Sequence, residues 1–178
     1  CGESLPNSYA VVNPKRKDCK YPFEMLAGVG VAFKVITAIS IKLGLDKEAY
    51  LKYLDIVTIG TIADIVPLQD ENRIITKMGI EKVRNTKNEG LKALVRVAGI
   101  KKLDSTSISF AIAPRINASG RMADASVAVK LLLEKSPVKA NSLAELLDSQ
   151  NKERQSVEKK ILEEVVNKIE KDSIFVLN

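Results

Sequence analysis

The chain has 178 residues and a net charge of +6 at pH 7, and 46% of its residues are hydrophobic, which is enough for a sizeable core. It contains two cysteines and no histidine, so a disulfide framework, a zinc site and every histidine-dependent catalytic site are excluded for this chain alone. The basic excess favours a polyanionic partner. Because no apolar run approaches the roughly 18 residues of a membrane span, we expect a cytoplasmic protein with no membrane partner.

The first elements in chain order are a short strand and two helices. Residues 8–12 form a β-type run. The basic residues of 15–20 are typical of a solvated loop and would also suit a contact with nucleic-acid phosphates. Dense apolar residues at 23–43 predict a buried helix. A further helix begins with Asp46 as its N-cap and stops before Pro67.

The middle of the chain is predicted to be helical almost throughout. Amphipathic patterns predict helices at residues 71–84 and 90–98. A short helix is expected at residues 105–113, and another begins after Asp124, which can serve as its N-cap. The polar faces of the helices at residues 71–84 and 90–98 carry no residue pattern that indicates a site.

A long helix is predicted over residues 136–171, because Ser136 and Pro137 form a strong helix start. Its wholly polar middle, residues 148–156, favours an inter-domain connector with both ends packed and its centre in solvent. The apolar run within residues 172–178 resembles a strand. Because a strand needs a partner for its hydrogen bonds, we expect the chain to be an internal part of a longer protein.

The sequence GTIAD at residues 60–64 raises the question of what Asp64 does. Its neighbours are aliphatic, so the carboxylate is expected to be largely buried, which is costly unless it is paired or bound to a metal. One interpretation is a cap or a buried hydrogen bond to Thr58 or Thr61. The other is a metal ligand or general base, for which a hard carboxylate on a rigid element is suitable.

The sequence IAPRINASGRM at residues 112–122 is predicted to be a slim loop, broken by Pro114 and Gly120. It carries Arg115, Asn117 and Arg121. Guanidinium groups bind phosphate oxygens in pairs, and an amide adds a neutral donor and acceptor. The alternative is a surface turn whose arginines pair with nearby carboxylates.

Six sequence blocks together carry a resemblance to a known family. They are VVNPKR at 11–16, YPF at 21–23, LAGVGVAFK at 26–34, GTIADIVPL at 60–68, APRINASGRM at 113–122 and LDSQNKERQ at 147–155. In this order the chain resembles the RecJ family of single-strand-specific DNA exonucleases, within the DHH phosphoesterase superfamily.

The resemblance implies an α/β fold, of which this chain forms a predominantly α-helical part with few short strands and a long connector helix. Residues 1–135 would be the C-terminal part of the catalytic domain, and residues 136–171 the connector helix. Residues 172–178 would form the first strand of the following domain.

The resemblance also assigns roles to the two site segments. It makes Asp64 a catalytic residue and a ligand of one of two Mn²⁺ or Mg²⁺ ions. It places Arg115, Asn117 and Arg121 in a loop that faces the metals, where they would hold the phosphates of single-stranded DNA. The implied activity of the intact protein is metal-dependent hydrolysis of that DNA from 5′ to 3′ in DNA repair and recombination. A helicase or a single-strand-binding protein is a further expected partner.

The Asp-His-His motif that supplies other metal ligands in the family is not in this chain, so we expect the chain alone to be inactive. Two other functions stay open. One is a different DHH-type phosphodiesterase that cuts short RNA or cyclic dinucleotides. The other is a non-catalytic adaptor that binds nucleic acid.

Overall fold

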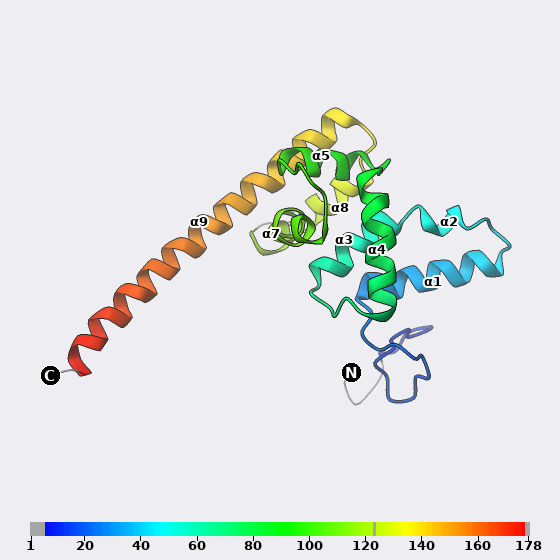
Figure 1. Cartoon of the computed structure of the whole chain (residues 1–178), viewed down its shortest axis with the longest axis horizontal. Helices are drawn as coiled ribbons and strands as arrows, with labels where there is room; N and C mark the ends of the chain where they lie inside the picture. Colours follow the sequence, from blue (N-terminus) through cyan, green and yellow to red (C-terminus); the bar gives the residue numbers. More distant parts are fainter. Residues whose placement is uncertain (1–5, 123, 177–178) are drawn as a thin grey trace. The chain divides into compact units, whose positions relative to one another are not determined.

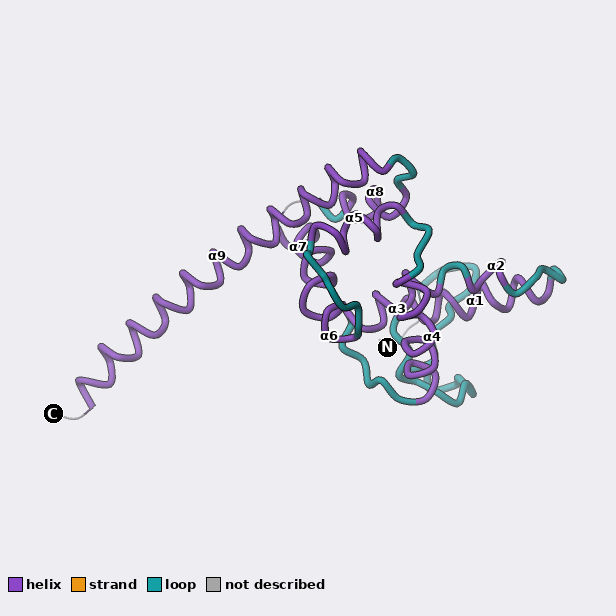
Figure 2. Tube along the Cα trace, turned by 45° about the horizontal axis from the view of Figure 1, so that its top comes forward, coloured by secondary structure: helices purple, strands orange, loops and turns teal. Residues whose placement is uncertain are grey.

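The computed structural model describes residues 6–122 and 124–176, and for residues 121, 122 and 170–176 it describes the backbone alone. Every regular element in this part of the chain is helical, as Figure 2 shows, and none of it forms a strand. The predominantly helical character is therefore confirmed. The strand predicted at residues 8–12 is wrong: this run is irregular, because no strand lies within the described residues to accept its backbone hydrogen bonds.

The helices follow one another with short connections (Figure 1). They are α1 (Gly28–Lys42), α2 (Glu48–Leu51), α3 (Leu54–Ala63), α4 (Asp70–Arg84), α5 (Glu89–Val97), α6 (Ser105–Ser107), the π-helix η1 (Ile108–Ile112), α7 (Ala113–Met122), α8 (Ser126–Leu133) and α9 (Pro137–Val176). No helix in the described part of the chain has both the length and the apolar character needed to cross a bilayer.

The chain forms two compact units. The first comprises residues 6–87 and 100–113, and the second comprises residues 88–99 and 114–176. The predicted domain division at residue 135 stays a prediction, because a compact packing unit and a domain of the longer family protein need not coincide.

The core of the first unit forms where α1, α3 and α4 meet. Its buried members are Phe23, Leu26, Phe33, Leu54, Val57 and Ile75. Helix α3 is buried along most of its length. The buried helix predicted at residues 23–43 is only partly correct, because α1 buries Phe33 but leaves Ile39 and Ile41 exposed. Helices α3 and α4 approach closely at Gly79: a Cβ atom there would lie 1.5 Å from Thr58 Oγ1 and 2.8 Å from the carbonyl oxygen of Leu54. Only glycine permits this packing.

The second unit packs α5 and α8 against the first part of α9. Its fully buried side chains include Leu91, Leu94, Leu131, Ala140, Ala144 and Leu147. Asn88 caps α5 by accepting a hydrogen bond from the backbone N–H of Leu91 at 3.0 Å, and its amide donates to the carbonyl of Leu132 at 2.7 Å. A Cβ at Gly90 would lie 2.1 Å from the carbonyl oxygen of Leu131, so α5 and α8 are in backbone contact.

Helix α9 begins at Pro137, as the sequence predicts, and runs to Val176 (Figure 1). The strand predicted at residues 172–178 is therefore wrong for residues 172–176; residues 177 and 178 lie outside the described residues. A solvated polar centre is also only partly correct. Asp148 and Asn151 within that stretch are buried, whereas residues 155–169 are exposed.

Candidate functional site

The end of α3 carries Asp64, the predicted metal ligand. The helix ends at Ala63 and Asp64 is its C-cap, with its backbone N–H bonded to the carbonyl of Gly60 at 3.1 Å. The N–H of Ile65 bonds to the carbonyl of Ile62 at 3.2 Å, and Ile65 has φ 55°. This left-handed conformation normally favours glycine and costs a β-branched residue about 1–2 kcal/mol. The turn after Asp64 is therefore strained.

The Asp64 side chain is exposed, so the predicted burial is wrong. The aliphatic residues that precede it, Ile59 and Ile62, lie on the buried helix, but Asp64 comes just after the last helical residue, where the chain has reached the surface and the next residue, Ile65, is exposed as well. Neither threonine binds it: the hydroxyl of Thr58 donates to the carbonyl of Ile75 at 3.1 Å, and that of Thr61 donates to the carbonyl of Val57 at 2.8 Å. The carboxylate has no hydrogen bond or ion pair with any described residue, so its oxygens are accessible to a cation.

A pair of divalent ions does not fit the described residues by themselves. No group of three or more Asp, Glu, Cys or His side chains that could hold a metal occurs among them. Mg²⁺ and Mn²⁺ are held by several oxygen ligands. Asp64 thus supplies one suitable ligand, and the remaining ligands would have to come from elsewhere.

The arginine-containing segment is helical, so the prediction of a loop is wrong. Helix α7 covers residues 113–122 and includes both Pro114 and Gly120. Pro114 has no N–H to donate to the carbonyl of Phe110, and its ring would crowd that carbonyl in a regular α-helix. The preceding turn is a π-helix, in which Ala113 N–H bonds to the carbonyl of Ile108, and this wider turn accommodates the proline.

Arg115, one of the three predicted phosphate ligands, binds a carboxylate within its own unit. Its Nε and Nη2 atoms lie 2.8 and 2.7 Å from Asp148 Oδ1, and the two side chains are only 15% and 11% exposed. Lys152 approaches the other oxygen of Asp148 at 2.8 Å. Burial raises the pKa of the Asp148 carboxyl, but hydrogen bonds and charges from Lys152 and Arg115 outweigh burial and hold that pKa below its usual value. The pair links α7 to α9.

Asn117 and position 121 differ from Arg115 in their placement. Asn117 is exposed. Position 121 lies four residues further along α7, so the two share one face of the helix, whereas position 115 lies on another. The side chain of Arg121 is outside the described residues. The three predicted ligands are thus brought onto one helix but not onto one face of it.

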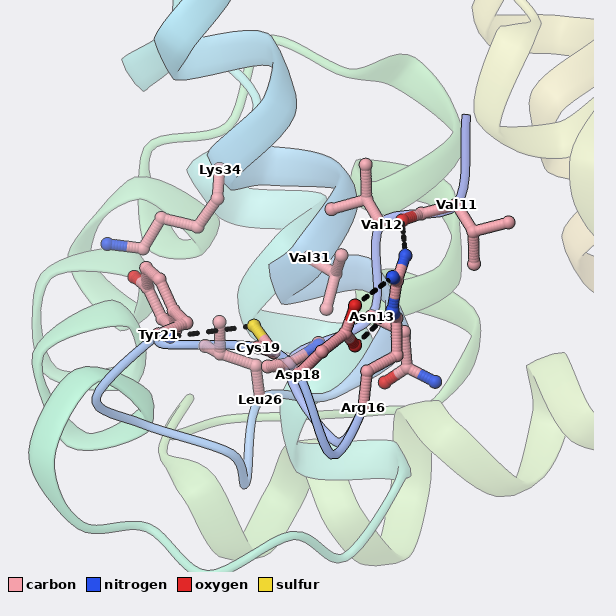
Figure 3. Close-up of a pocket in the computed structure, with 11 residues that line it drawn as sticks. Val11, Val12, Asn13, Arg16, Asp18, Cys19, Tyr21, Leu26, Val31 and Lys34 are labelled. Carbon is pink, nitrogen blue, oxygen red and sulfur yellow. Dashed lines mark hydrogen bonds and ion pairs between the residues drawn. The ribbon is translucent and has the colours of Figure 1, made fainter. Parts of the chain in front are cut away.

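The first unit also has a cavity that the sequence did not indicate (Figure 3). It measures about 270 Å³, and its walls include Val11, Val12, Leu26 and Val31. The basic loop forms part of its rim, where Arg16 pairs with Asp18 and donates to the carbonyl of Val11 at 3.1 Å. The positive charge of Arg16 is thus paired with Asp18 within the loop, which is in keeping with a solvated turn.

At the other side of the cavity, Tyr21 and Lys34 both bind Glu71 on α4. The Tyr21 hydroxyl lies 2.6 Å from Glu71 Oε2, and Lys34 Nζ donates to Oε1. Burial raises the pKa of Glu71, but the two donors outweigh it and lower that pKa. These contacts join residues 50 and 37 positions apart, so no local sequence pattern could have revealed them.

The chain is similar to curated bacterial exonucleases, although no family model matches it. It is 43% identical over 175 residues to the single-stranded-DNA-specific exonuclease RecJ of Bacillus subtilis (strain 168), covering 97% of this chain and 22% of that protein. It is 40% identical over 182 residues to RecJ of Escherichia coli (strain K12), covering 96% of this chain and 32% of that protein.

The chain belongs to the RecJ family. It spans between about a fifth and a third of the length of these two RecJ proteins. A solved structure of the exonuclease RecJ bound to manganese matches 94% of this chain and 42% of its own, with a TM-score of 0.82 and 32% identity. RecJ from Thermus thermophilus in complex with Mg²⁺ matches 85% of this chain and 23% of its own, with a TM-score of 0.74 and 34% identity.

Proposed function

We propose that this chain is part of a metal-dependent exonuclease that hydrolyses single-stranded DNA from 5′ to 3′, in DNA repair and recombination in the cytoplasm. The proposal is supported by the RecJ relatives, which are named as single-stranded-DNA-specific exonucleases, and by the solved RecJ structures with Mn²⁺ or Mg²⁺. The activity, the substrate and a helicase or single-strand-binding partner belong to the whole protein and remain part of the proposal.

In this proposal Asp64 binds one of the metal ions. The observation that carries it is the exposed carboxylate that has no partner among the described residues, on a backbone fixed by the end of α3. Carboxylate oxygens suit Mg²⁺ and Mn²⁺. When bound, such an ion would act as a Lewis acid toward a phosphodiester. Because one carboxylate cannot hold a metal pair, we expect the isolated chain to release no nucleotides from single-stranded DNA.

The DNA backbone would contact the face of α7 that carries Asn117 and Arg121. An amide and a guanidinium one helical turn apart can bind adjacent phosphate oxygens without reading the base sequence. Arg115 is in a different position, because a phosphate would have to share its guanidinium with Asp148. We therefore propose that Arg115 chiefly holds α7 against α9, and its predicted phosphate contact stays a prediction.

Binding of labelled single-stranded DNA by the chain tests this proposal. We expect Arg121→Ala to weaken binding for all DNA sequences alike and to lower the slope of log affinity against log salt by about 1. Arg96→Ala is the matched control, since Arg96 is an exposed arginine on α5 of the same unit and its loss changes the net charge equally. Equal effects of the two substitutions would mean that α7 has no special role in DNA binding.

A further inference from the structure

Asn72 is a fully buried amide in the first turn of α4, with 0% of its surface exposed. Its Nδ2 atom donates two hydrogen bonds: one to the carbonyl of Met25 at 2.7 Å and one to the carbonyl of Pro67 at 3.0 Å. Met25 precedes α1, and Pro67 lies in the loop between α3 and α4. One side chain therefore joins two loops that are distant in sequence and belong to the same unit.

The loop that Asn72 binds has an unusual backbone. Ile65 at its start has φ 55°, and Asp70, the first residue of α4 after the loop, has φ 45°; neither is glycine. Ile65 is also 86% exposed, so burial of its side chain does not offset this conformation. Non-glycine residues remain in the left-handed region only where surrounding contacts hold them there. Pro67 lies between the two strained positions, so a hydrogen bond to its carbonyl restrains the middle of the loop.

The chemistry of position 72 fits this role better than a role in packing alone. An amide nitrogen has two hydrogens, and both are used on the two carbonyls. A carboxylate here would present only acceptors to the carbonyls, and an aliphatic side chain would leave both carbonyls without this donor. The Oδ1 atom of Asn72 is buried without a hydrogen-bond partner. A buried orphan acceptor is unfavourable, so packing alone does not account for an amide at this position.

The neighbouring residue makes the first turn of α4 a junction. Glu71 binds Tyr21 and Lys34, so the segment before α1, α1 itself and the loop after α3 all attach to this turn. Figure 3 shows Tyr21 and Lys34 side by side, reaching the same edge of the cavity. The loop after Asp64 is thus bonded to the same helical turn that binds α1 and the segment before it.

We propose that Asn72 is a positioning residue for Asp64: it holds the loop at residues 65–69 in its strained conformation, so that α3 ends at Ala63 and its C-cap, Asp64, presents the carboxylate to solvent. The importance of this placement for a metal site rests on the proposed function. The effect on the backbone does not, because the end of α3 can be observed directly in the chain without DNA, metal or catalysis.

Amide hydrogen exchange measured by NMR on the full chain tests the proposal. The reporters are the N–H groups of Asp64 and Ile65, which bond to Gly60 and Ile62 at the end of α3. In Asn72→Asp we expect both to exchange about tenfold faster than in the wild type, because the donors are lost and the end of α3 frays. Amides of α5, in the other unit, should be unaffected.

Thr76→Val is the matched control, because Thr76 is also buried in α4, one turn later, but its hydroxyl bonds only to carbonyls of its own helix. This variant should leave the exchange of Asp64 and Ile65 unchanged relative to the rest of α3. If Asn72→Asp does not fold, Asn72→Ser and Asn72→Ala can be compared instead. Serine keeps one hydrogen-bond donor and alanine keeps none, and both side chains leave a cavity of similar size. Faster exchange with alanine than with serine at Asp64 and Ile65 supports the proposal.

Two results would overturn the positioning role. One is unchanged exchange at Asp64 and Ile65 in a folded Asn72 variant. The other is an equal acceleration along the whole of α3 and α4, which is the behaviour of an ordinary core residue. Neither outcome depends on DNA binding, so failure of the proposed nuclease function would leave this test intact.

Discussion

The two segments that were expected to form the site have opposite surroundings. Asp64, at the end of α3, is exposed and its carboxylate has no partner among the described residues. Arg115, on α7, is mostly buried and is bound to Asp148. Each is a charged residue in a segment that otherwise consists mainly of aliphatic residues (around Asp64) or contains several small residues (after Arg115). Their accessibility to a ligand differs because one follows the last turn of a buried helix and the other packs between two helices.

This difference shows that the type of residue does not decide whether it can bind a ligand. A carboxylate surrounded by aliphatic residues in sequence is accessible, since its helix ends one residue earlier. Arg115, in a segment rich in small residues, is already bound, since α7 brings its guanidinium to the carboxylate of Asp148, 33 positions away in sequence.

The largest effect is expected from Gly79→Ala, which tests whether the helix that carries Asp64 is fixed by its packing. The new Cβ would overlap Thr58 and a backbone oxygen of α3, so α3 and α4 would have to separate. We expect the free energy of unfolding to fall by about 3 kcal/mol. Urea denaturation measures it. The control is Gly28→Ala, which meets no atom within 4 Å and should change stability by less than about 0.5 kcal/mol.

The two segments are compared directly by one type of substitution, aspartate to asparagine, at Asp64 and at Asp148, the partner of Arg115. Asp148→Asn leaves the mostly buried Arg115 without its charged partner and should lower the free energy of unfolding by about 2 kcal/mol. Asp64→Asn removes an exposed charge with no partner among the described residues and should change stability by less than about 0.5 kcal/mol. Equal losses in urea denaturation would show that the two acids are held alike.

The pH dependence of stability provides a control for the Asp148 effect. Because the folded-state pKa of Asp148 is lowered, its stabilisation is complete above the unfolded-state value of about 3.9 and is lost as the pH falls through the lower folded-state pKa. The difference in stability between the wild type and Asp148→Asn should therefore be constant near neutral pH and shrink below about pH 4. If the difference in free energy of unfolding between the two proteins stays the same in acid, the loss of stability in Asp148→Asn does not come from the charge of Asp148.

A smaller effect of opposite sign is expected at the strained turn after Asp64. Asparagine tolerates the left-handed conformation better than isoleucine, and the Ile65 side chain is mostly exposed, so little packing is lost. We expect Ile65→Asn to raise the free energy of unfolding by about 0.5–1 kcal/mol, measured by thermal and urea denaturation. A loss of stability would show that the isoleucine side chain makes contacts that stabilise the turn.

Much of the helical structure could be predicted from the sequence because its signals are local. The amphipathic pattern at residues 71–84 corresponds to α4 at Asp70–Arg84, and Ser136 with Pro137 marks the start of α9. The six motif blocks also identified the RecJ family, which the relatives confirm. These features depend on residues a few positions apart, and helix periodicity and capping act over that range.

Only the tertiary structure decided which of the predicted site residues are accessible. Asp64 is exposed because α3 ends just before it. The pairing of Arg115 with Asp148 and the bonds of Asn72 join residues that are as many as 47 positions apart in sequence. The helical form of α7 likewise depended on a π-turn that accommodates Pro114. Burial and long-range hydrogen bonding are properties of the packed chain, and a one-dimensional pattern does not contain them.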